Sequence, residues 1–572
     1  MLGNEGVARG AYEAGVNVAT AYPGTPSTEI TETIAKYDEI YAEWSPNEKV
    51  ALEVAIGASI GGARAIVSMK HVGLNVAADP LFTVSYTGVN GGLVIVVADD
   101  PGMHSSQNEQ DSRFYARSAH VPMLEPSDSQ EAKDFVKMAF EISEKYDTPV
   151  FIRMTTRVAH SQSVVEIAER KPIPLKEYKK DFNKYVMMPG MARKRHLVVE
   201  ERMKRLQEDC NNFSINRVEY GDKSIGIITS GIVYQYAKEA FPNASFLKLG
   251  MVHPLPKKLI EEFASKVEKL YVLEELEPVI EEQIRSWGIS VIGKELFSVQ
   301  GEYSAKLIEE RIKGIKVQEA SVENLPMRPP VMCPGCPHRA AYYIIKKLKL
   351  HVMGDIGCYT LGALPPLETV DACVCMGASV GMAHGIAKAR GKEFANKTVA
   401  VIGDSTFIHS GITSLIDIVY NNGIATVIIL DNSTTAMTGH QDHPATGKTV
   451  KGDPAPMLNL VDLVKAVGIK NVRVVDPFNL EESETVLKEE TQKEEPSVII
   501  FKRACALLSK TFENPLQIDS STCRRCGLCL KLGCPAIENK DGGIVTINYA
   551  LCNGCGLCEK VCRFNAIRRA DA

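Results

Sequence analysis

The feature that most constrains the fold of this chain is a run of cysteines near its C-terminus. Eight of its 15 cysteines form two C-x2-C-x2-C triplets, each followed by a fourth: Cys523, Cys526, Cys529 and Cys534, then Cys552, Cys555, Cys558 and Cys562. Zinc ribbons use four cysteines in two pairs, which is a different arrangement. Two triplets with distant fourth cysteines are typical of a module that holds two iron–sulfur clusters.

In such modules the fourth thiolate of each cluster comes from the other run. We therefore expect one [4Fe–4S] cluster on Cys523, Cys526, Cys529 and Cys562, and a second on Cys552, Cys555, Cys558 and Cys534. The chain departs from the common pattern in two ways: one extra residue precedes Cys534, and Arg563 stands where a proline often follows the last cysteine. Both departures affect the local loop shape rather than ligation. Because such clusters pass single electrons, residues 513–572 are predicted to form an electron-transfer domain.

Length and charge limit the classes of protein to which the chain can belong. A disulfide framework suits a small secreted protein, so dense cysteine in 572 residues favours metal binding or redox work. The net charge of −5 gives no basic field for nucleic acid. The longest apolar runs fall well short of the about 20 residues of a membrane span, and the N-terminus lacks a basic segment before an apolar one. We expect a cytoplasmic protein that binds neither nucleic acid nor membrane.

The rest of the chain alternates apolar runs with helical patterns, which predicts α/β domains with mostly parallel sheets. We expect a helix at Glu48–Ile60 and strands at 16–21, 65–69, 93–98, 149–154, 225–229, 398–402, 425–430 and 497–502. The predicted domains are 1–160, 223–323, 324–512 and 513–572. Residues 161–222 change in character, with 11 Lys and Arg against 6 Asp and Glu between Lys171 and Asp209. We interpret this segment as a solvated linker with a surface helix rather than a nucleic-acid patch.

Polar residues follow two of these strands. Gly403-Asp404-Ser405 comes after one strand, and Asp431-Asn432 follows the next. This resembles the signature of thiamine diphosphate enzymes, in which the Asp and Asn side chains hold Mg²⁺, a cation that prefers oxygen ligands. The resemblance makes the carbonyl of Thr434 a third ligand, and the diphosphate can lie at the helix start near Gly403 and Ser405. Ser405 replaces the usual glycine, and a plain α/β turn is the alternative.

Six blocks along the chain carry a more specific resemblance. They are Tyr22-Pro-Gly-Thr-Pro-Ser27, Asn47-Glu-Lys-Val-Ala-Leu-Glu53, Met69-Lys-His-Val-Gly-Leu-Asn75, Cys333-Pro-Gly-Cys-Pro-His338, Asp355-Ile-Gly-Cys-Tyr-Thr360 and Thr435-Ala-Met-Thr-Gly-His-Gln441. Together they resemble the α subunits of indolepyruvate ferredoxin oxidoreductases, within the 2-oxoacid:ferredoxin oxidoreductase superfamily. The resemblance spans the whole chain in order.

The resemblance implies a fold of several doubly wound thiamine-diphosphate-binding-type domains plus a small α+β two-cluster ferredoxin-like domain. Residues 1–160 become the pyrimidine-binding domain, 223–323 a transketolase C-terminal-like domain, and 324–512 the diphosphate- and magnesium-binding domain. The implied reaction is oxidative decarboxylation of an aryl 2-oxoacid with coenzyme A, giving an aryl-acetyl-CoA, CO2 and reduced ferredoxin. It also implies a smaller β subunit, commonly in an α2β2 assembly.

The resemblance also suggests catalytic residues. Glu48 matches the carboxylate that contacts the aminopyrimidine ring, with Glu53 as the competitor. Thr25 matches a threonine near the substrate carbonyl, although turn chemistry at Thr-Pro also explains it. A 2-oxoacid carboxylate suits a guanidinium, and Arg117 lies at the family spacing; Arg113 is four residues earlier, and either can be a structural ion pair.

Other polar residues of the blocks are expected to line the cofactor pocket. Those predicted to bind cofactor are His338, Gly357 and His440, and Lys70 and His71 belong to the same group. The remaining cysteines, Cys210, Cys373 and Cys375, are interpreted as buried small hydrophobes that bind no metal.

Four cysteines outside the tail predict a third cluster. They are Cys333, Cys336, Cys358 and Cys505. The resemblance makes them the ligands of a proximal [4Fe–4S] cluster beside the thiamine; the alternative is a rigid turn at the C-x2-C pair and a core residue at Cys505.

Other functions stay open at this point. A non-oxidative thiamine decarboxylase would leave the eight-cysteine tail without a task. An electron-transfer subunit with a degenerate thiamine fold would not need Glu48, Asp404 and Asn432. Another branch of the superfamily differs only in its 2-oxoacid, and the sequence shows neither a side-chain pocket nor a coenzyme A motif.

Overall fold

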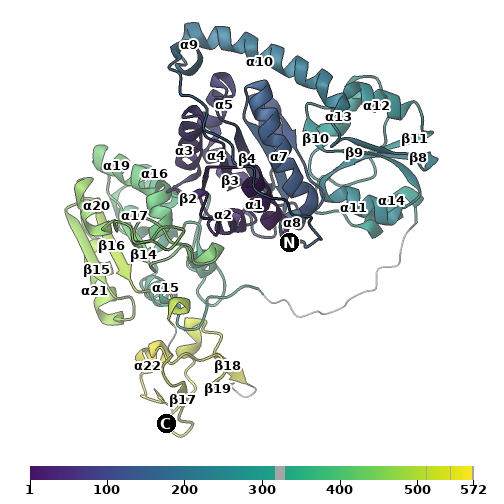
Figure 1. The fold of residues 1–572 in the computed structure, drawn as a ribbon. Helices are drawn as coiled ribbons and strands as arrows, with labels where there is room; N and C mark the ends of the chain where they lie inside the picture. Colours follow the sequence, from purple (N-terminus) through teal and green to yellow (C-terminus); the bar gives the residue numbers. More distant parts are fainter. Residues whose placement is uncertain (316–328, 510–511, 541–542, 570–572) are drawn as a thin grey trace. The chain divides into compact units, whose positions relative to one another are not determined.

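The computed structural model describes residues 1–315, 329–509, 512–540 and 543–569 (Figure 1). Contacts divide the chain into two compact units, Met1–Ser321 and Val322–Ala572. The predicted boundary between residues 323 and 324 lies outside the described residues. The other domain bounds stay predictions.

A seven-stranded sheet forms the centre of the first unit, in the order β10-β5-β6-β4-β3-β1-β2. Its strands are β1 (Val18–Ala21), β2 (Tyr41–Trp44), β3 (Ala65–Lys70), β4 (Leu93–Asp99), β5 (Met123–Leu124), β6 (Val150–Thr155) and β10 (Met251–His253). All pairs are parallel except β10 with β5. β3, β4 and β6 are buried along their whole length, as parallel strands covered on both faces must be. The strand predicted at 16–21 begins two residues later.

Helices cover this sheet: α1 (Gly3–Glu13), α2 (Thr28–Ile34), α3 (Glu48–Ile60), α4 (His71–Val76), α5 (Ala78–Thr87), α6 (Arg113–Ala119), α7 (Ser129–Tyr146) and α8 (Thr156–His160). The prediction of Glu48–Ile60 is confirmed to the residue. Its start is fixed locally, because the Asn47 side chain accepts a hydrogen bond of 2.9 Å from Val50 N. Strands β1 to β4 and β6 all point their carboxyl ends to one edge of the sheet, where Thr25, Glu48 and Lys70 follow.

A second sheet in this unit has the order β11-β8-β9-β7. Its strands are β7 (Arg217–Glu219), β8 (Asp222–Ser230), β9 (Ala244–Leu249) and β11 (Lys269–Leu273), with helices α11 (Gly231–Ala240), α12 (Lys257–Ala264), α13 (Val279–Ser286) and α14 (Ala305–Lys313). The short strand β10 leaves this segment and pairs with β5 of the first sheet. A buried ion pair between Lys248 and Glu131 also joins the two parts.

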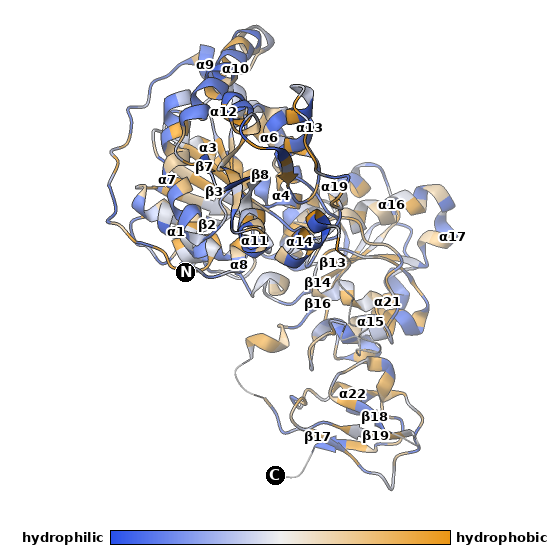
Figure 2. Cartoon of the chain, turned by 90° about the vertical axis from the view of Figure 1, so that its right-hand side faces the viewer, coloured by the Kyte–Doolittle hydropathy of each residue, from blue (hydrophilic) through white to orange (hydrophobic). Residues whose placement is uncertain are grey.

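The basic segment contains α9 (Phe182–Tyr185) and α10 (Pro189–Asp209). Figure 2 shows both hydrophilic and hydrophobic residues along α10, and only Val199, Arg202 and Leu206 of this helix are buried. The Arg202 guanidinium donates to the carbonyls of Ser85 and Asp147 at 2.8 and 2.7 Å. The segment therefore holds a surface helix fastened to α5, as the solvated-helix interpretation expects.

The second unit contains a parallel five-stranded sheet in the order β12-β13-β14-β16-β15. Its strands are β12 (His351–Met353), β13 (Thr398–Gly403), β14 (Thr426–Asp431), β15 (Asn471–Val475) and β16 (Ser497–Lys502), and its helices α15 (Pro337–Leu348), α16 (Ala378–Arg390), α17 (Lys392–Ala395), α18 (Asp404–Thr406), α19 (Ile412–Tyr420), α20 (Leu460–Ala466) and α21 (Leu480–Glu490). Gly403 is opposite Leu430 in the register. The residues that follow β13 and β14 therefore meet at one edge.

The cysteine-rich tail is a small α+β domain. It pairs β17 (Leu516–Ile518) with β20 (Ile567–Arg569) and β18 (Ile537–Lys540) with β19 (Ile544–Ile547), both antiparallel, next to α22 (Leu557–Val561). Its core includes Ala340 and Phe478 from the preceding part of the unit. The Arg339 guanidinium donates to Leu532 O at 2.7 Å, so the tail is packed onto that part. Within the described residues, every helix is too short or too polar to cross a membrane.

Candidate cofactor sites

The oxygens of Asp404 and Thr434 converge on the Asn432 side chain where β13 and β14 end. The end of the Asn432 side chain that faces Asp404 lies 2.8 Å from Thr434 O and 3.2 Å from Asp404 Oδ1. With its nitrogen at this position, the amide donates to both oxygens. With its oxygen there instead, three oxygens can ligate one cation between them. Carboxylate, amide and carbonyl oxygens are ligands that Mg²⁺ takes, so these residues fit the predicted magnesium site.

The Asp404 carboxylate is held in place by backbone donors. Its Oδ1 accepts from Ser405 N and its Oδ2 from Ser433 N, each at 2.9 Å, and His443 Nε2 lies 3.3 Å from Oδ2. Burial, and then the charge of Asp404, raise the pKa of Asp431. The neighbouring carboxylates of Asp404 and Asp431 form an electronegative site that suits a cation.

Two predicted histidines lie in the same unit. His338 Nε2 is 3.5 Å from Asn432 Nδ2, and burial lowers the pKa of His338 to about 4, so this ring is neutral at pH 7. His440 has a φ of +69°, and its backbone N–H donates to Thr435 O at 3.1 Å. Among the described residues, the buried Nδ1 of His440 has no hydrogen-bond partner.

Asp355 is a site residue that the sequence analysis quoted in a block but did not single out. Its carboxylate accepts from Gly377 N at 2.8 Å and from Ser379 N at 2.9 Å, so it ties the start of α16 to this edge of the sheet. The ring of the neighbouring Tyr359 explains why residue 403 is a glycine, because a Cβ at Gly403 would lie 2.8 Å from Tyr359 Cε1. The ring leaves no room for a side chain there.

The four cysteines predicted for a proximal cluster lie near one another. Burial raises the pKa of Cys336 to about 12 and that of Cys358 to about 11. Neighbouring thiols add to these shifts: Cys358 and Cys333 act on Cys336, Cys505 and Cys333 act on Cys358, and Cys333 acts on Cys505. The backbone N–H of Cys505 donates to Asn432 O at 2.9 Å. The thiols therefore gather next to the converging oxygens.

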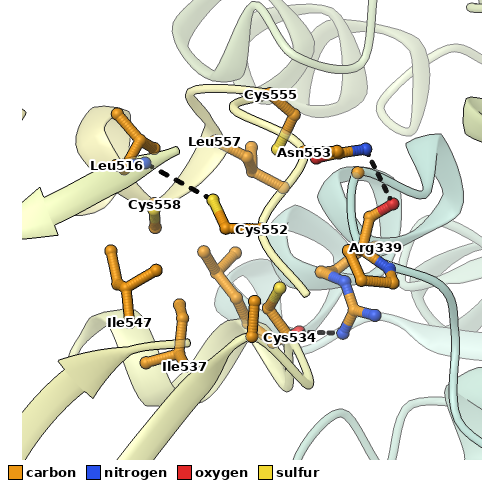
Figure 3. A pocket seen from close by; sticks show the side chains of 14 residues that line it. Arg339, Leu516, Cys534, Ile537, Ile547, Cys552, Asn553, Cys555, Leu557 and Cys558 are labelled. Atoms are coloured by element: carbon orange, nitrogen blue, oxygen red, sulfur yellow. Dashed lines mark hydrogen bonds between the residues drawn. The ribbon is translucent and has the colours of Figure 1, made fainter. Parts of the chain in front are cut away.

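One tail pocket, the inner pocket, is lined by Cys534, Cys552, Cys555 and Cys558 (Figure 3). It has about 400 Å³ of empty space, partly open to solvent. Apolar side chains such as Ile537 and Ile547 form part of its wall, and Arg339, Pro334 and Gly335 contribute from the preceding part of the unit. These cysteines are one of the two sets expected from the spacing.

A second tail pocket, the outer pocket, is lined by Cys523, Cys526, Cys529 and Cys562 and has about 360 Å³ of empty space. These are the other expected set. Within the described residues, no three His, Cys, Asp or Glu side chains converge on a single metal ion. A cubane holds its four thiolates at separate corners, and the converging oxygens include an amide and a carbonyl, so neither kind of site requires such a convergence.

The predicted carboxylate of the first unit is buried. Glu48, the first residue of α3, is 4% exposed, and a Cβ at Gly73 would lie 2.5 Å from Glu48 Oε1. The competitor Glu53 is exposed and pairs with Lys49, as a helix-surface acid does. Thr25 is half-buried after β1. The buried Lys70 donates from Nζ to Ser105 O at 2.7 Å.

The two arginines considered for the substrate carboxylate differ in environment. Arg113 is 1% exposed, with NH1 2.5 Å from Glu274 Oε2 and NH2 2.5 Å from Asp111 Oδ2, so its guanidinium is used as a structural ion pair. Arg117 is exposed on α6 and stays a prediction.

The remaining cysteines require one correction. Cys210 is buried as expected, but Cys373 is half-buried and Cys375 is exposed. Both lie in the irregular stretch before α16, where no sheet covers them.

Comparison with known proteins identifies relatives along the whole chain. The indolepyruvate oxidoreductase subunit IorA of Archaeoglobus fulgidus is 43% identical over 100% of this chain and 97% of its own. The IorA subunits of Pyrococcus horikoshii and Methanothermobacter marburgensis are each 42% identical, over 94% and 95% of this chain and 91% and 93% of theirs. The chain belongs to the IorA family.

Family models match the corresponding parts of this IorA-family chain. "Pyruvate flavodoxin/ferredoxin oxidoreductase, thiamine diP-bdg" matches residues 9–216, "Thiamine pyrophosphate enzyme, C-terminal TPP binding domain" matches 355–501, and "4Fe-4S binding domain" matches 545–568. The predicted fold class and resemblance are confirmed. The chain is a thiamine-diphosphate-dependent oxidoreductase α subunit with an iron–sulfur electron-transfer domain.

Proposed function

We propose that this chain is the catalytic α subunit of an indolepyruvate:ferredoxin oxidoreductase. The reaction is the oxidative decarboxylation of an aryl 2-oxoacid with coenzyme A, giving an aryl-acetyl-CoA and CO2, with ferredoxin as the electron acceptor. The observation that carries this proposal is the hydrogen bond from Cys505 N to Asn432 O at 2.9 Å. This backbone bond places the residue that carries one thiol of the four-cysteine group beside the residue whose side chain belongs to the oxygen cluster. A one-electron site beside a thiamine site serves oxidation rather than simple decarboxylation.

Mg²⁺ is proposed to bind Asp404 Oδ1, Asn432 Oδ1 and the carbonyl of Thr434, with further oxygens from the cofactor diphosphate. The start of the helix after β13 then faces the diphosphate, with Gly403 and Ser405 there. Gly357, His338 and His440 are proposed to contact the same cofactor. The neutral state of His338, whose pKa is lowered to about 4 by burial, avoids placing a positive ring next to the cation.

Bound thiamine diphosphate supplies an electron sink for the carbon that loses CO2. Glu48 is proposed to hydrogen-bond the aminopyrimidine ring and to exchange a proton with it. Thr25 is proposed to contact the substrate carbonyl, and Arg117 to bind the substrate carboxylate.

Three [4Fe–4S] clusters are proposed, on the proximal cysteines and in the inner and outer pockets. The donor sets fit, because each is four thiols. Burial, and then neighbouring thiols, raise the pKa of Cys358 and of Cys558, and a bound cation would favour their thiolate forms. Pro334 and Gly335, which lie between Cys333 and Cys336, also line the inner pocket. The inner pocket therefore lies beside the turn that carries Cys333 and Cys336.

The proposed partners are a smaller β subunit, in an α2β2 assembly, and ferredoxin; the proposed location is the cytoplasm. The relatives support the first of these, since they are named as subunits. Coenzyme A is proposed as co-substrate.

The test is anaerobic reduction of the enzyme, co-expressed with its smaller subunit. Indolepyruvate with coenzyme A should bleach the iron–sulfur absorption and yield the acyl-CoA. Aldehyde production without any electron acceptor would instead identify a non-oxidative decarboxylase. Intact clusters that no 2-oxoacid reduces would identify a subunit with electron transfer alone.

A further inference from the structure

We infer that three arginines at the outer pocket, Arg524, Arg525 and Arg563, form a docking surface for an acidic protein that accepts single electrons. We call this the arginine face. The inference rests on the proposed function and deepens it, because it names the surface at which the electrons leave the chain.

The three arginines surround one group of cysteines. Arg524 and Arg525 lie between Cys523 and Cys526 and line the outer pocket, and Arg563 directly follows Cys562. All three are exposed. Arg525 has a φ of +53°, a backbone conformation that glycine or asparagine adopts more readily. Local backbone geometry therefore does not explain an arginine at this position.

Three other cations of the tail have partners. Arg568 lies 3.8 Å from Asp519 Oδ2, and Arg569 pairs with Glu513 at 2.8 Å. Lys560 donates to Phe478 O at 2.8 Å, toward the preceding part of the unit. By contrast, the arginine face has no ion pair to any of the residues that the structure describes.

Two carboxylates of the tail, Asp519 and Glu538, are engaged by other groups. Asp519 accepts hydrogen bonds from Ser521 and Thr522, which hold its pKa at about 2, and its nearest cation is Arg568. Glu538 accepts from Asn548 at 2.8 Å. The positive charge of the arginine face is therefore available to a partner.

The outer pocket is also the more accessible of the two tail pockets. The inner pocket is walled by Pro334, Gly335 and Arg339. The outer pocket has the exposed Cys526 and is lined by Phe564, which is 42% exposed. Electrons cross only short gaps between centres, so an acceptor protein must contact the chain at this pocket.

The chemistry of the partner follows from the charge. Encounters between electron-transfer proteins bury little surface and are transient, so a few charges dominate their association rate. Three exposed arginines favour an acidic carrier, and the exposed aromatic ring of Phe564 in the wall of the outer pocket adds an apolar contact. A small acidic protein with its own one-electron centre, such as an acidic ferredoxin, fits this surface.

The experiment uses the complete enzyme with its smaller subunit and a purified ferredoxin of net negative charge. The triple variant Arg524→Gln, Arg525→Gln, Arg563→Gln is compared with a double variant of the paired arginines, Arg568→Gln, Arg569→Gln. The ratio of kcat/KM for ferredoxin to kcat/KM for a small dye should fall about tenfold in the triple variant only. Its dependence on salt should weaken as well.

Several results would overturn the inference: an unchanged ratio, an equal fall in the double variant, or a changed outer-cluster potential with the ferredoxin KM unaltered. Loss of the smaller subunit from the triple variant would overturn it too, because the face would then bind that subunit. If the triple variant contains less iron, Arg563→Gln alone gives the decisive measurement, since Arg563 does not line the pocket.

A failure of the proposed function can be distinguished from a failure of the arginine face. If the proposed function fails, no 2-oxoacid reduces the dye with the wild-type enzyme. The arginine face can still be tested, because dithionite-reduced enzyme mixed with oxidised ferredoxin reports the transfer rate without any 2-oxoacid.

Discussion

The Asn553 side chain donates a hydrogen bond of 3.0 Å to the carbonyl of Pro334, 219 residues earlier in the chain. Asn553 lies between two cysteines of the inner pocket, and Pro334 lies in the turn of the Cys333 and Cys336 pair. A Cβ at Gly335 would collide with the Asn553 amide, so this glycine permits the close approach. The contact brings the tail against the segment that carries the proximal cysteines.

The oxygen cluster predicts the effect of removing one ligand. Asp404→Ala should abolish Mg²⁺-dependent binding of thiamine diphosphate, because the site loses its charged oxygen. Calorimetric titration measures the affinity, and iron content should stay at the wild-type value. Unchanged cofactor affinity in the variant would refute the assignment of the magnesium site.

Glu48→Gln should keep the cofactor bound but slow turnover about 10²- to 10⁴-fold, as loss of a general acid–base group does. Deuterium exchange at the thiazolium C2 measures the affected step directly. Glu53→Gln is the matched control on the same helix, since Glu53 is exposed and pairs with Lys49. Wild-type exchange in Glu48→Gln would move the role to another carboxylate.

The proximal cysteines can be tested in the full chain. Cys505→Ala should lower the iron content from about 12 to about 8 atoms per chain, because one of three four-iron clusters loses a ligand. The bond from the backbone of residue 505 to Asn432 does not need the thiol, so thiamine binding should persist. Cys375→Ala, at an exposed cysteine, should keep all the iron. Full iron content in Cys505→Ala would contradict the proximal cluster.

Burial raises the pKa of Glu275 from its ordinary value of 4.5 to about 7, and the charge of Glu302 adds to the shift. The neutral form is therefore favoured in the folded state. The stability that Glu275 contributes to the folded state is fully present below pH 4.5 and is lost as the pH rises through about 7.

Glu275→Gln should remove this pH-dependent loss of stability, because an amide does not ionise. The hydrogen bond is kept, since an amide oxygen can still accept the 2.8 Å bond from Tyr303 N. The variant should become more stable than wild type by on the order of 2–3 kcal/mol between pH 5 and pH 8. Denaturant unfolding followed by tryptophan fluorescence measures it, since Trp44 and Trp287 both lie in the first unit. A gap between variant and wild type that stays constant with pH would exclude ionisation of Glu275 as the cause.

Substrate preference tests the family branch. Indolepyruvate or phenylpyruvate should exceed pyruvate in kcat/KM, in keeping with the names of the relatives. Steady-state assays with each 2-oxoacid and the same ferredoxin give the comparison. Pyruvate turnover equal to that of the aryl substrates would place the enzyme in a neighbouring branch.

Features with a local physical cause could be predicted from the sequence. Helix α3 begins and ends where its pattern indicated, because the Asn47 cap and an apolar face lie within its own residues. The buried strand at 497–502 was also predicted to the residue. The two cysteine triplets of the tail can be predicted from spacing, since short loops bring their thiols together, and the fourth cysteine of each set follows from the general rule that it comes from the other run. The two tail pockets have these linings.

The tertiary structure decided what depends on residues far apart in the chain. Arg113 pairs with its chain neighbour Asp111 and also with Glu274, which lies 161 residues later and 2.5 Å away; the second pair exists only in the folded chain. Strand β10 has three residues and no pattern of its own, so its pairing with β5 appears only when the sheet is complete. The sequence by itself determined the strongly patterned elements and predicted the candidate cofactor residues, whose signals are local. Long-range packing determined which charges are neutralised and which stay available, because burial and partners exist only in the folded chain.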